Sequence, residues 1–262
     1  MVRRPLGNHH DGPDTLLVTP ETTHTEPVTA ETENLRKLIV GVRFVLFDFD
    51  GPICGLFAGL KAEQIARELV EWLEQQGLSG LLTDEERKHP DPQVVLRAVS
   101  SRHPGSDLVT ELEARLTEHE LEAIAKAMPT AYADPLIRTW RALGCRLAVA
   151  SNNSARTVTA YLDDRGLLDC FTPHIYGRTS DLERLKPHPH ALNRALIAMG
   201  AEPAAALMIG DSPMDYQAAQ RAGVHFLGYA RNDETFSRLR GAGAKVVVDS
   251  LLAVLTALRC HA

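Results

Sequence analysis

Apolar residues from about residue 38 onward follow two alternating patterns. Short apolar runs rich in branched residues predict strands, and apolar residues that recur every three or four positions predict helices. The predicted strands are Val42–Phe47, Arg146–Ala150, His174–Tyr176, Ala206–Ile209, His225–Tyr229 and Lys245–Val248. The predicted helices between them are Pro135–Leu143, Ala155–Asp164, Pro189–Met199, Pro213–Ala222, Asp233–Leu239 and Leu251–Leu258. Because strands alternate with helices through short connections, we predict an α/β fold with a doubly wound parallel sheet.

The alternation is interrupted between Gly55 and about Thr130, where no segment has the pattern of a strand. Apolar spacing predicts three helices there, and a capping box formed by Thr117 and Glu120 predicts the start of a fourth. The residues that indicate these helices are Ile65, Leu69, Trp72 and Leu73, then Val94, Val95 and Ala98, then Leu108, Leu112 and Leu116, and finally Leu121, Ile124 and Met128. An all-helical segment inserted beside the first strand favours a lid over the active site, although packing decoration is the alternative.

The first 36 residues are rich in Pro, Thr, Glu, His and Asp and lack apolar periodicity, which predicts a disordered tail. His9 and His10 with Asp11 are a possible metal site, but a flexible polar tail is the preferred interpretation. We therefore divide the chain into a tail of residues 1–36, an α/β core of residues 37–54 and 131–262, and a helical cap of residues 55–130.

Composition excludes several classes of function. The chain has 262 residues, is 44% hydrophobic and 24% charged, and carries a formal net charge of −6 without a basic stripe, which argues against nucleic-acid binding. No apolar run approaches the ~20 residues that cross a bilayer, and no apolar region follows Arg3 and Arg4 as in a signal peptide. The scattered cysteines predict free thiols in a reducing compartment: Cys54, Cys145, Cys170 and Cys260. We therefore expect a cytoplasmic protein that binds neither nucleic acid nor membrane, in an oligomeric state that the sequence does not indicate.

The first predicted strand ends in two carboxylates, Asp48 and Asp50, and Gly51 then lets the chain turn. Side chains alternate along a strand, so these two acids project to the same side. Two acids at the end of a core strand are costly unless a cation, a hydrogen-bond network or a reaction uses them. The pair predicts metal-assisted chemistry with a carboxylate nucleophile.

Other strand ends carry further polar residues, and in an open parallel sheet ligands bind outside the carboxyl ends of the strands. Ser151 and Asn152 follow the second core strand at the start of a helix, where they form either a phosphate site or simple N-caps. Asp211 follows a later strand and is expected to point toward the first acid pair. Asp215 is either a fourth acid of the site or the capping-box partner of Ser212. Converging acids of this kind indicate a hard cation, usually Mg²⁺ where phosphate also binds.

Lys186 lies in a proline-rich loop before the helix Pro189–Met199. An isolated lysine there is ordinarily a surface residue, but beside these strand ends it is a suitable counter-charge for a phosphate. His188 and His190 have no partner at metal-ligand spacing, so we expect them to face solvent or to cap the helix.

Four motifs occur in order between about Phe44 and Tyr229: Asp48-x-Asp50-Gly51, Ser151-Asn152, Lys186-Pro187-x-Pro189 and Gly210-Asp211-Ser212-x-x-Asp215. Together they resemble the four motifs of the haloacid dehalogenase-like hydrolase superfamily. The helix after the fourth motif is similar to that of the phosphoglycolate phosphatase-like branch. The resemblance implies a Rossmann-like core with a helical cap, and a Mg²⁺-dependent phosphatase that acts on a small phosphorylated metabolite.

The resemblance also implies a role for each site residue. Asp48 would attack phosphorus and form an aspartyl phosphate, and Asp50 would act as general acid and then as general base. Phosphate would be bound by Ser151, Asn152 and Lys186. Mg²⁺ would be held by Asp48, by the backbone carbonyl of Asp50, by Asp211 and by Asp215. The presence of Asp50 favours a phosphatase over a dehalogenase, because the departure of a halide needs no general acid.

Two departures from the family pattern bear on the substrate. Pro52 stands where family phosphatases usually have Thr, and Gly55-Leu56 replaces an Asp-Ser pair. Both lead into the predicted cap, whose basic residues either face the cleft or are solvated helix charges: Lys61, Arg67, Arg97 and Arg102. The alternatives to a phosphatase are a phosphomutase of the same fold and, less favoured because the acids and the lysine are intact, a non-catalytic scaffold.

Overall fold

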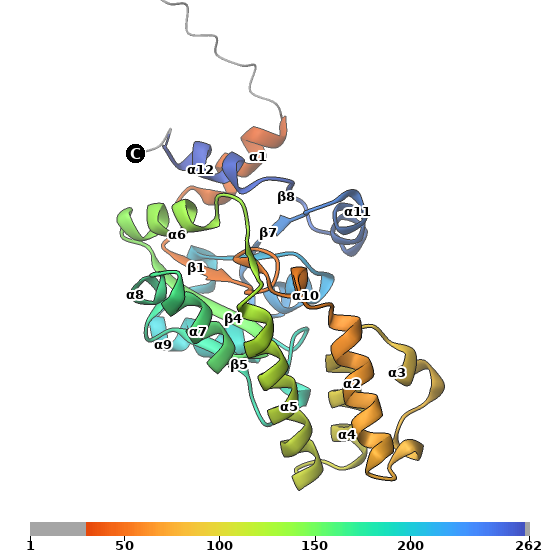
Figure 1. Ribbon diagram of the computed structural model, residues 1–262. Helices are drawn as coiled ribbons and strands as arrows, with labels where there is room; N and C mark the ends of the chain where they lie inside the picture. The colour runs from red at the N-terminus through yellow and green to blue at the C-terminus, as the bar shows by residue number, and fades with distance from the viewer. Residues whose placement is uncertain (1–29, 260–262) are drawn as a thin grey trace, which may run out of the picture.

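A computed structural model describes residues 30–259, and its centre is a sheet of six parallel strands in the order β5-β4-β1-β6-β7-β8 (Figure 1). The strands are β1 Phe44–Phe47, β4 Arg146–Ser154, β5 Ile175–Arg178, β6 Ala206–Gly210, β7 His225–Tyr229 and β8 Val247–Val248. The predicted α/β fold class is confirmed. The strand order reverses between β1 and β6, and in such a sheet the ligand site lies outside the strand ends at this point.

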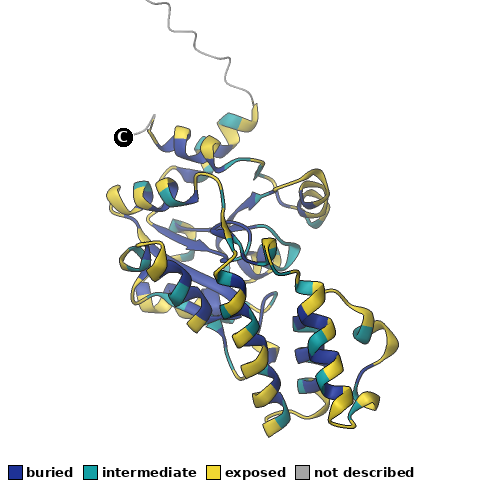
Figure 2. Ribbon diagram, viewed as in Figure 1, coloured by how far each residue is buried: buried dark blue, intermediate teal, exposed yellow. Residues whose placement is uncertain are grey.

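Helices cover both faces of the sheet, with buried inner sides and exposed outer sides (Figure 2). One face is covered by α1 Ala30–Ile39, α6 Ala133–Ala142, α7 Ala155–Asp164, α8 Leu168–Phe171 and α12 Leu251–Arg259. The other is covered by α9 His190–Met199, α10 Pro213–Ala222 and α11 Asp233–Ala242. All six predicted core helices are present, most of them with ends shifted by a few residues.

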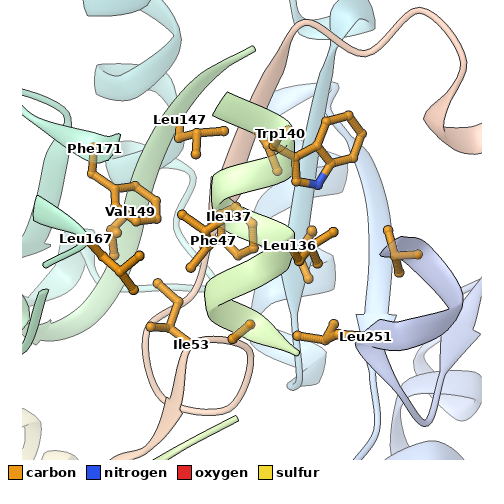
Figure 3. Packing of buried hydrophobic residues seen from close by; sticks show 14 of the residues in the cluster. Phe47, Ile53, Leu136, Ile137, Trp140, Leu147, Val149, Leu167, Phe171 and Leu251 are labelled. Atoms are coloured by element: carbon orange, nitrogen blue, oxygen red, sulfur yellow. The ribbon is translucent and has the colours of Figure 1, made fainter. Parts of the chain in front are cut away.

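Alternate residues of β1 pack into the two cores. Val45 and Phe47 belong to the cluster that contains Trp140, shown from close by in Figure 3, and Leu46 belongs to the cluster on the opposite face. The ring of Phe47 meets that of Phe171 edge-on, with centroids 5.9 Å apart. A central parallel strand is covered on both sides, which explains the uninterrupted apolar run in its sequence.

The first four α-helices after β1 form a helical insertion (residues 56–127) with an apolar cluster of its own (Figure 1). They are α2 Ala62–Gln75, α3 Asp84–Lys88, α4 Pro92–Arg102 and α5 Asp107–Ile124. The acidic run after Thr83 begins α3, where Thr83 and Glu86 form a capping box. Leu182 and Leu185 from the core extend the cluster, so the insertion also packs on the rest of the molecule.

The predicted start of a fourth helix at Thr117 is wrong. Thr117 and Glu120 lie inside α5, which begins at its N-cap Ser106 and runs without glycine or proline to residue 124. The hydroxyl of Thr117 donates to the side chain of Glu113 at 3.0 Å and does not cap the helix. These polar residues occupy one side of a continuous helix, and their partners lie in the core.

The expected absence of strands from residues 55–130 is also wrong. Strand β2 (Cys54–Gly55) pairs antiparallel with β3 (Met128–Pro129), so Met128 is not helical. The short pair holds together the two ends of the insertion, which depart from the core at nearby points.

The expected disorder through residue 36 is wrong for residues 30–36, which belong to α1. Leu35 and Ile39 of this helix are buried, and α1 packs against α12. The possible metal site at His9, His10 and Asp11 lies outside the described residues. Within the described part of the chain, no helix is long and apolar enough to cross a membrane. The described cysteines are unpaired thiols, as predicted, and Cys260 lies outside the described range.

Candidate active site

One cavity of about 520 Å³ lies at the carboxyl ends of β1, β4 and β6. Its lining includes every residue that the sequence predicted for the site: Asp48, Asp50, Ser151, Asn152, Lys186, Asp211 and Asp215. The helical insertion supplies a further wall with Phe57, Ala62, Pro90, Asp91 and Gln93. A second cavity of about 590 Å³ between α1 and α11 contains none of the predicted site residues.

The loop after β1 brings the first acid pair close to the end of β6. The backbone N–H of Asp48 donates to the carbonyl of Ile209 at 2.9 Å, and its Oδ1 accepts from the N–H of Phe49 at 2.7 Å. Gly51 has φ of +112°, and a Cβ at this position would lie 2.4 Å from Cγ of Asp211. Glycine is therefore required both for the left-handed backbone and for the approach of the two loops.

Lys186 is buried between two carboxylates. Its Nζ lies 2.8 Å from Oδ1 of Asp48 and 2.6 Å from Oδ1 of Asp215. The prediction that Lys186 is a counter-charge in the site therefore agrees with its position, and its alternative as a surface residue is wrong. Arg231, which follows β7, is the second nearby cation and lies 3.3 Å from Oδ2 of Asp211.

Asp215 both caps a helix and contributes to the acid cluster. Its Oδ2 accepts from the backbone N–H of Ser212 at 3.0 Å and from the Ser212 hydroxyl at 2.7 Å, which completes the capping box of α10. Its Oδ1 is the atom that contacts Lys186. The two interpretations offered by the sequence are therefore compatible.

Burial and neighbouring negative charges raise the pKa values of acids in the site. Burial raises the pKa of Asp48 to about 7, with Asp215 adding to the rise and Lys186 opposing it. Burial also raises the pKa of Asp50, and it raises that of Asp211 well above the ordinary value with help from Asp215 and Asp48. Burial alone would lower the pKa of Lys186, but Asp215 and Asp48 together raise it. Lys186 is therefore a permanent cation, and the acids still repel one another.

The donor set suits a divalent cation. Carboxylate oxygens of Asp48, Asp211 and Asp215 lie within 4.8 Å of one another. Carboxylate oxygens are ligands that Mg²⁺ prefers. The side chain of Asp50 is not part of this group, and its Oδ1 accepts from the N–H of Leu56 at 2.9 Å. A contact between Asp50 and a metal through its backbone carbonyl stays a prediction.

Ser151 and Asn152 are not the helix caps that the sequence allowed. Strand β4 continues through both, and Ser154 is the N-cap of α7. The hydroxyl of Ser151 donates to Oδ1 of Asn153 at 3.1 Å. The side chain of Asn152 accepts from the N–H of Lys186 at 2.8 Å and donates to its carbonyl at 3.2 Å. Asn152 thus fixes the loop that carries Lys186.

The basic residues of the insertion divide into two kinds. Arg67 and Arg102 pair with acids on the outside of the insertion, and Lys61 precedes α2. Arg97 is part-buried, and its guanidinium donates to the carbonyl of Lys186 at 3.0 Å. The solvated interpretation therefore fits Arg67, while Arg97 faces the core.

Sequence reasoning missed the buried pair Glu120 and Arg178, whose charged groups lie 2.7 Å apart. Arg178 ends β5, and its side chain is fully buried. The position of Arg178 at the end of a core strand was one signal in the sequence that could have indicated this pair. The spacing of Glu113, Thr117 and Glu120 along one side of α5 was another.

A family model described as haloacid dehalogenase-like hydrolase matches residues 42–223, which is well over half of the chain. The chain therefore belongs to the haloacid dehalogenase-like hydrolase family. The predicted family is confirmed, and the chain falls into the class of hydrolytic enzymes.

Individual relatives agree with this assignment. The chain is 27% identical over 232 residues to the phosphoglycolate phosphatase of Aliivibrio fischeri, a match that covers 83% of this chain and 98% of that protein. It is 30% identical over 145 residues to the phosphoglycolate phosphatase of Thiobacillus denitrificans, and there it spans little more than half of the relative's length, 56%. The crystal structure of a predicted phosphoglycolate phosphatase from Haemophilus somnus has a TM-score of 0.61 at 18% identity and covers 83% of this chain and 98% of that chain. At this identity the structural likeness concerns the fold alone.

Proposed function

We propose that this protein is a Mg²⁺-dependent phosphatase that hydrolyses a small phosphorylated metabolite through an aspartyl phosphate on Asp48. The observation that carries the proposal is the position of Lys186, whose Nζ lies 2.8 Å from Asp48 in a cavity where Asp211 and Asp215 converge. A carboxylate beside a fixed cation and a metal-ligand group is suited to attack an anionic phosphoryl group.

The metal would be held by Asp48, Asp211 and Asp215, with the backbone carbonyl of Asp50 as a further ligand. When bound, Mg²⁺ supplies positive charge that favours the ionised acids and offsets the repulsion between Asp48 and a phosphate dianion. The charged residues that line the cavity are five acids and three cations: Asp48, Asp50, Asp91, Asp211 and Asp215, with Lys186, Arg231 and Arg238. Their formal charge is therefore negative in excess, which suits a divalent cation.

Asp48 and Asp50 would have different tasks because their surroundings differ. An oxygen of Asp48 forms a bond to phosphorus as the bond from phosphorus to the leaving oxygen breaks, and Asp50 gives that oxygen a proton. Asp50 then takes a proton from the water that attacks the aspartyl phosphate, which releases phosphate and restores Asp48. The raised pKa of Asp50 suits a group that must carry a proton at the start.

The remaining residues would bind and enclose the phosphoryl group. The Nζ of Lys186 and the hydroxyl of Ser151 are the groups that we assign to its oxygens, and Asn152 holds the Lys186 loop. The insertion residues Asp91 and Gln93 also line the cavity. We therefore assign the insertion the role of a cap that contacts the leaving group and limits the access of water.

Hydrolysis of p-nitrophenyl phosphate, with and without Mg²⁺, tests the proposal directly. We expect Mg²⁺-dependent turnover by the wild-type protein and a loss of at least about 10³-fold in kcat for Asp48→Asn, because the nucleophile is removed. Asp164→Asn is the matched control, since Asp164 is an exposed acid at the end of α7. A panel of phosphorylated metabolites that includes phosphoglycolate then identifies the substrate.

Three outcomes would contradict parts of the proposal. The absence of Mg²⁺-dependent turnover on every substrate would favour a scaffold. Activation by a sugar bisphosphate, with phosphate passed to a sugar hydroxyl, would favour a phosphomutase. Full activity of Asp48→Asn would refute the assignment of the nucleophile.

A further inference from the structure

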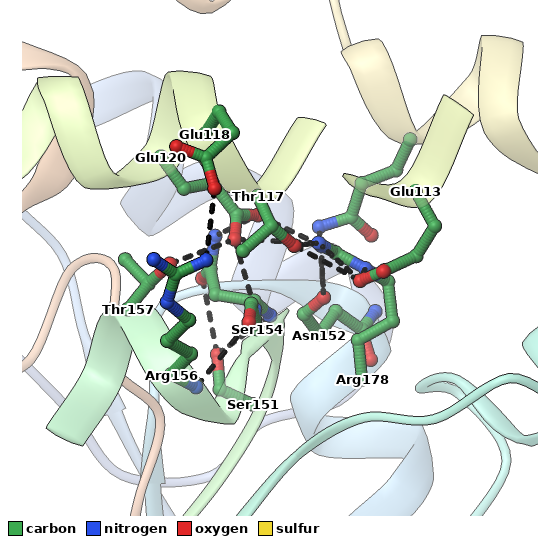
Figure 4. A network of polar contacts seen from close by, with 12 residues as sticks. Glu113, Thr117, Glu118, Glu120, Ser151, Asn152, Ser154, Arg156, Thr157 and Arg178 are labelled. Carbon is green, nitrogen blue, oxygen red and sulfur yellow. Dashed lines mark hydrogen bonds and ion pairs between the residues drawn. The ribbon is translucent and has the colours of Figure 1, made fainter. Parts of the chain in front are cut away.

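Glu120 of α5 and Arg178 of β5 form a buried ion pair between the helical insertion and the core (Figure 4). The side chain of Arg178 is fully buried and that of Glu120 is 1% exposed. Glu113 also lies 3.0 Å from the guanidinium of Arg178, and Thr117 accepts from it at 2.9 Å. An arginine held by three groups on one helix has little freedom, so its remaining contact is well defined.

That remaining contact is with the strand end that carries Ser151 and Asn152. A nitrogen of Arg178 donates to the backbone carbonyl of Asn152 at 3.2 Å. The side chain of Asn152 makes the reciprocal pair of hydrogen bonds with the backbone of Lys186. The Nζ of Lys186 is in turn 2.8 Å from Asp48. Arg178 is thus connected to Lys186 through a single residue.

Hydrogen bonds connect Glu120 to Ser151, the other residue that we assign to phosphate binding. Its Oε1 accepts from the side-chain amide of Asn153 at 3.1 Å, and its Oε2 accepts from the N–H of Ser154 at 2.9 Å. The carbonyl oxygen of the Asn153 side chain accepts from the hydroxyl of Ser151 at 3.1 Å. Glu120 therefore orients Asn153, and Asn153 directs the Ser151 hydroxyl.

We infer that Glu120 and Arg178 are positioning residues for the phosphoryl-binding groups: Arg178 acts on Lys186 through Asn152, and Glu120 acts on Ser151 through Asn153. The inference rests on the proposed phosphatase function. Neither residue lines the cavity. Glu120 belongs to α5, and Arg178 is held by residues of α5. The position of α5 on the core therefore determines the positions of the Lys186 ammonium and the Ser151 hydroxyl.

The molecule contains a matched control for this pair. Arg156 of α7 and Glu118 of α5 also join the core to the insertion, with a contact of 2.8 Å. Their side chains are 67% and 63% exposed, and the guanidinium of Arg156 donates to Glu118 at the surface. The two pairs therefore differ in burial and in their connection to the strand end.

The test compares Arg178→Met, Glu120→Gln, the double variant E120Q/R178M and the control Arg156→Met. Arg178→Met leaves the buried carboxylate of Glu120 without its cation, whereas the double variant removes both charges, so we expect the double variant to melt at a higher temperature than Arg178→Met. We expect kcat to stay reduced by about tenfold or more in the double variant, because the carbonyl of Asn152 still lacks the guanidinium donor and small displacements of reacting groups are costly. Arg156→Met should keep kcat and KM within twofold.

Activities are measured well below the lowest melting temperature, so that a loss of stability alone leaves them unchanged. The inhibition constant for inorganic phosphate is measured beside kcat and should rise in the double variant. A double variant with wild-type kcat and a wild-type inhibition constant would show that the pair only stabilises the fold. If the wild-type protein has no turnover, the proposed function fails, and phosphate binding followed by calorimetry in the same variants still decides the positioning role.

Discussion

Gly51 and Gly210 lie so close to acids of the site that a side chain at either position would collide with one of them. A Cβ on Gly210 would lie 2.5 Å from Cβ of Asp215, and a Cβ on Gly51 would lie 2.4 Å from Cγ of Asp211. Side chains in both places would push apart the carboxylates that converge on the cavity. The convergence of the acids therefore requires glycine at both positions.

Replacement of Gly51 by Ala tests this statement. The left-handed φ of +112° makes any side chain strained, and the new methyl group would displace Asp211. We expect a loss of about 1–3 kcal/mol in the free energy of unfolding. We also expect a markedly weaker stabilisation by Mg²⁺, followed by thermal melting. Gly80→Ala is the control, because a Cβ there meets nothing within 4 Å. Equal melting and equal response to Mg²⁺ in both variants would contradict the argument.

Strand ends and helix starts arrange these residues at the scale of elements. Asp48 follows β1 and Asp211 follows β6, and the two strands are direct neighbours in the sheet. The register that pairs Phe47 with Ile209 brings the two acids to the same edge. Helix α5 approaches this edge from the insertion, with apolar residues toward its own cluster and polar residues toward the core.

The apolar side of α5 is expected to stabilise the insertion. Leu112 is fully buried in the cluster of the insertion, so Leu112→Ala should lower the free energy of unfolding by about 2–5 kcal/mol through lost burial and a cavity. Urea denaturation measures this change. Glu111→Ala on the same helix removes only an exposed pair with Arg115 and should cost less than about 0.5 kcal/mol. Similar losses in the two variants would show that the cluster contributes little.

The elements of the core could be predicted because each has a strong local signal. Helix α7 and strand β7 have the predicted bounds, since turn residues and apolar runs define them. Asp48, Asp50 and Asp211 could be predicted because they follow apolar strands. Lys186 could be predicted because it lies in a proline-rich loop that precedes a helix. The role of Glu120 could not be predicted in this way: its partner Arg178 is distant in the sequence, and a local capping pattern offered a competing interpretation. Buried polar pairs between elements depend on tertiary packing, which a local pattern does not contain.

At the scale of the whole molecule, pH should affect stability. The contribution of Asp48 to the stability of the metal-free protein should fall as pH rises, whereas the stabilisation by Mg²⁺ should grow. Burial and the neighbouring acid raise the pKa of Asp48 to about 7 in the folded, metal-free protein. In the unfolded chain an aspartate has a pKa of about 3.9. The folded state therefore binds a proton that the unfolded chain does not, and this residue makes metal-free protein more stable as pH falls from about 7 toward 4.

Mg²⁺ competes with these protons, so its stabilising effect should grow as pH rises. We expect the increase in melting temperature caused by saturating Mg²⁺ to be larger at pH 8 than at pH 5.5. Differential scanning fluorimetry at the two values measures it, and Asp48→Asn should weaken the dependence. An increase that is the same at both values, or larger at pH 5.5, would contradict the protonation state that we assign to Asp48.

The strand order described above also has a consequence for the assembly of the protein during synthesis. Strand β1 emerges early, yet its neighbours in the sheet are β4 and β6, and β6 begins only at Ala206. Strand β1 can therefore pair with β4 on one side once residues 146–149 have been made, but its other side stays unpaired until β6 is complete. The insertion, whose helices contact one another locally, can gain structure in the meantime. The acids that follow β1 thus reach their final surroundings only after residues 206–210 have been made.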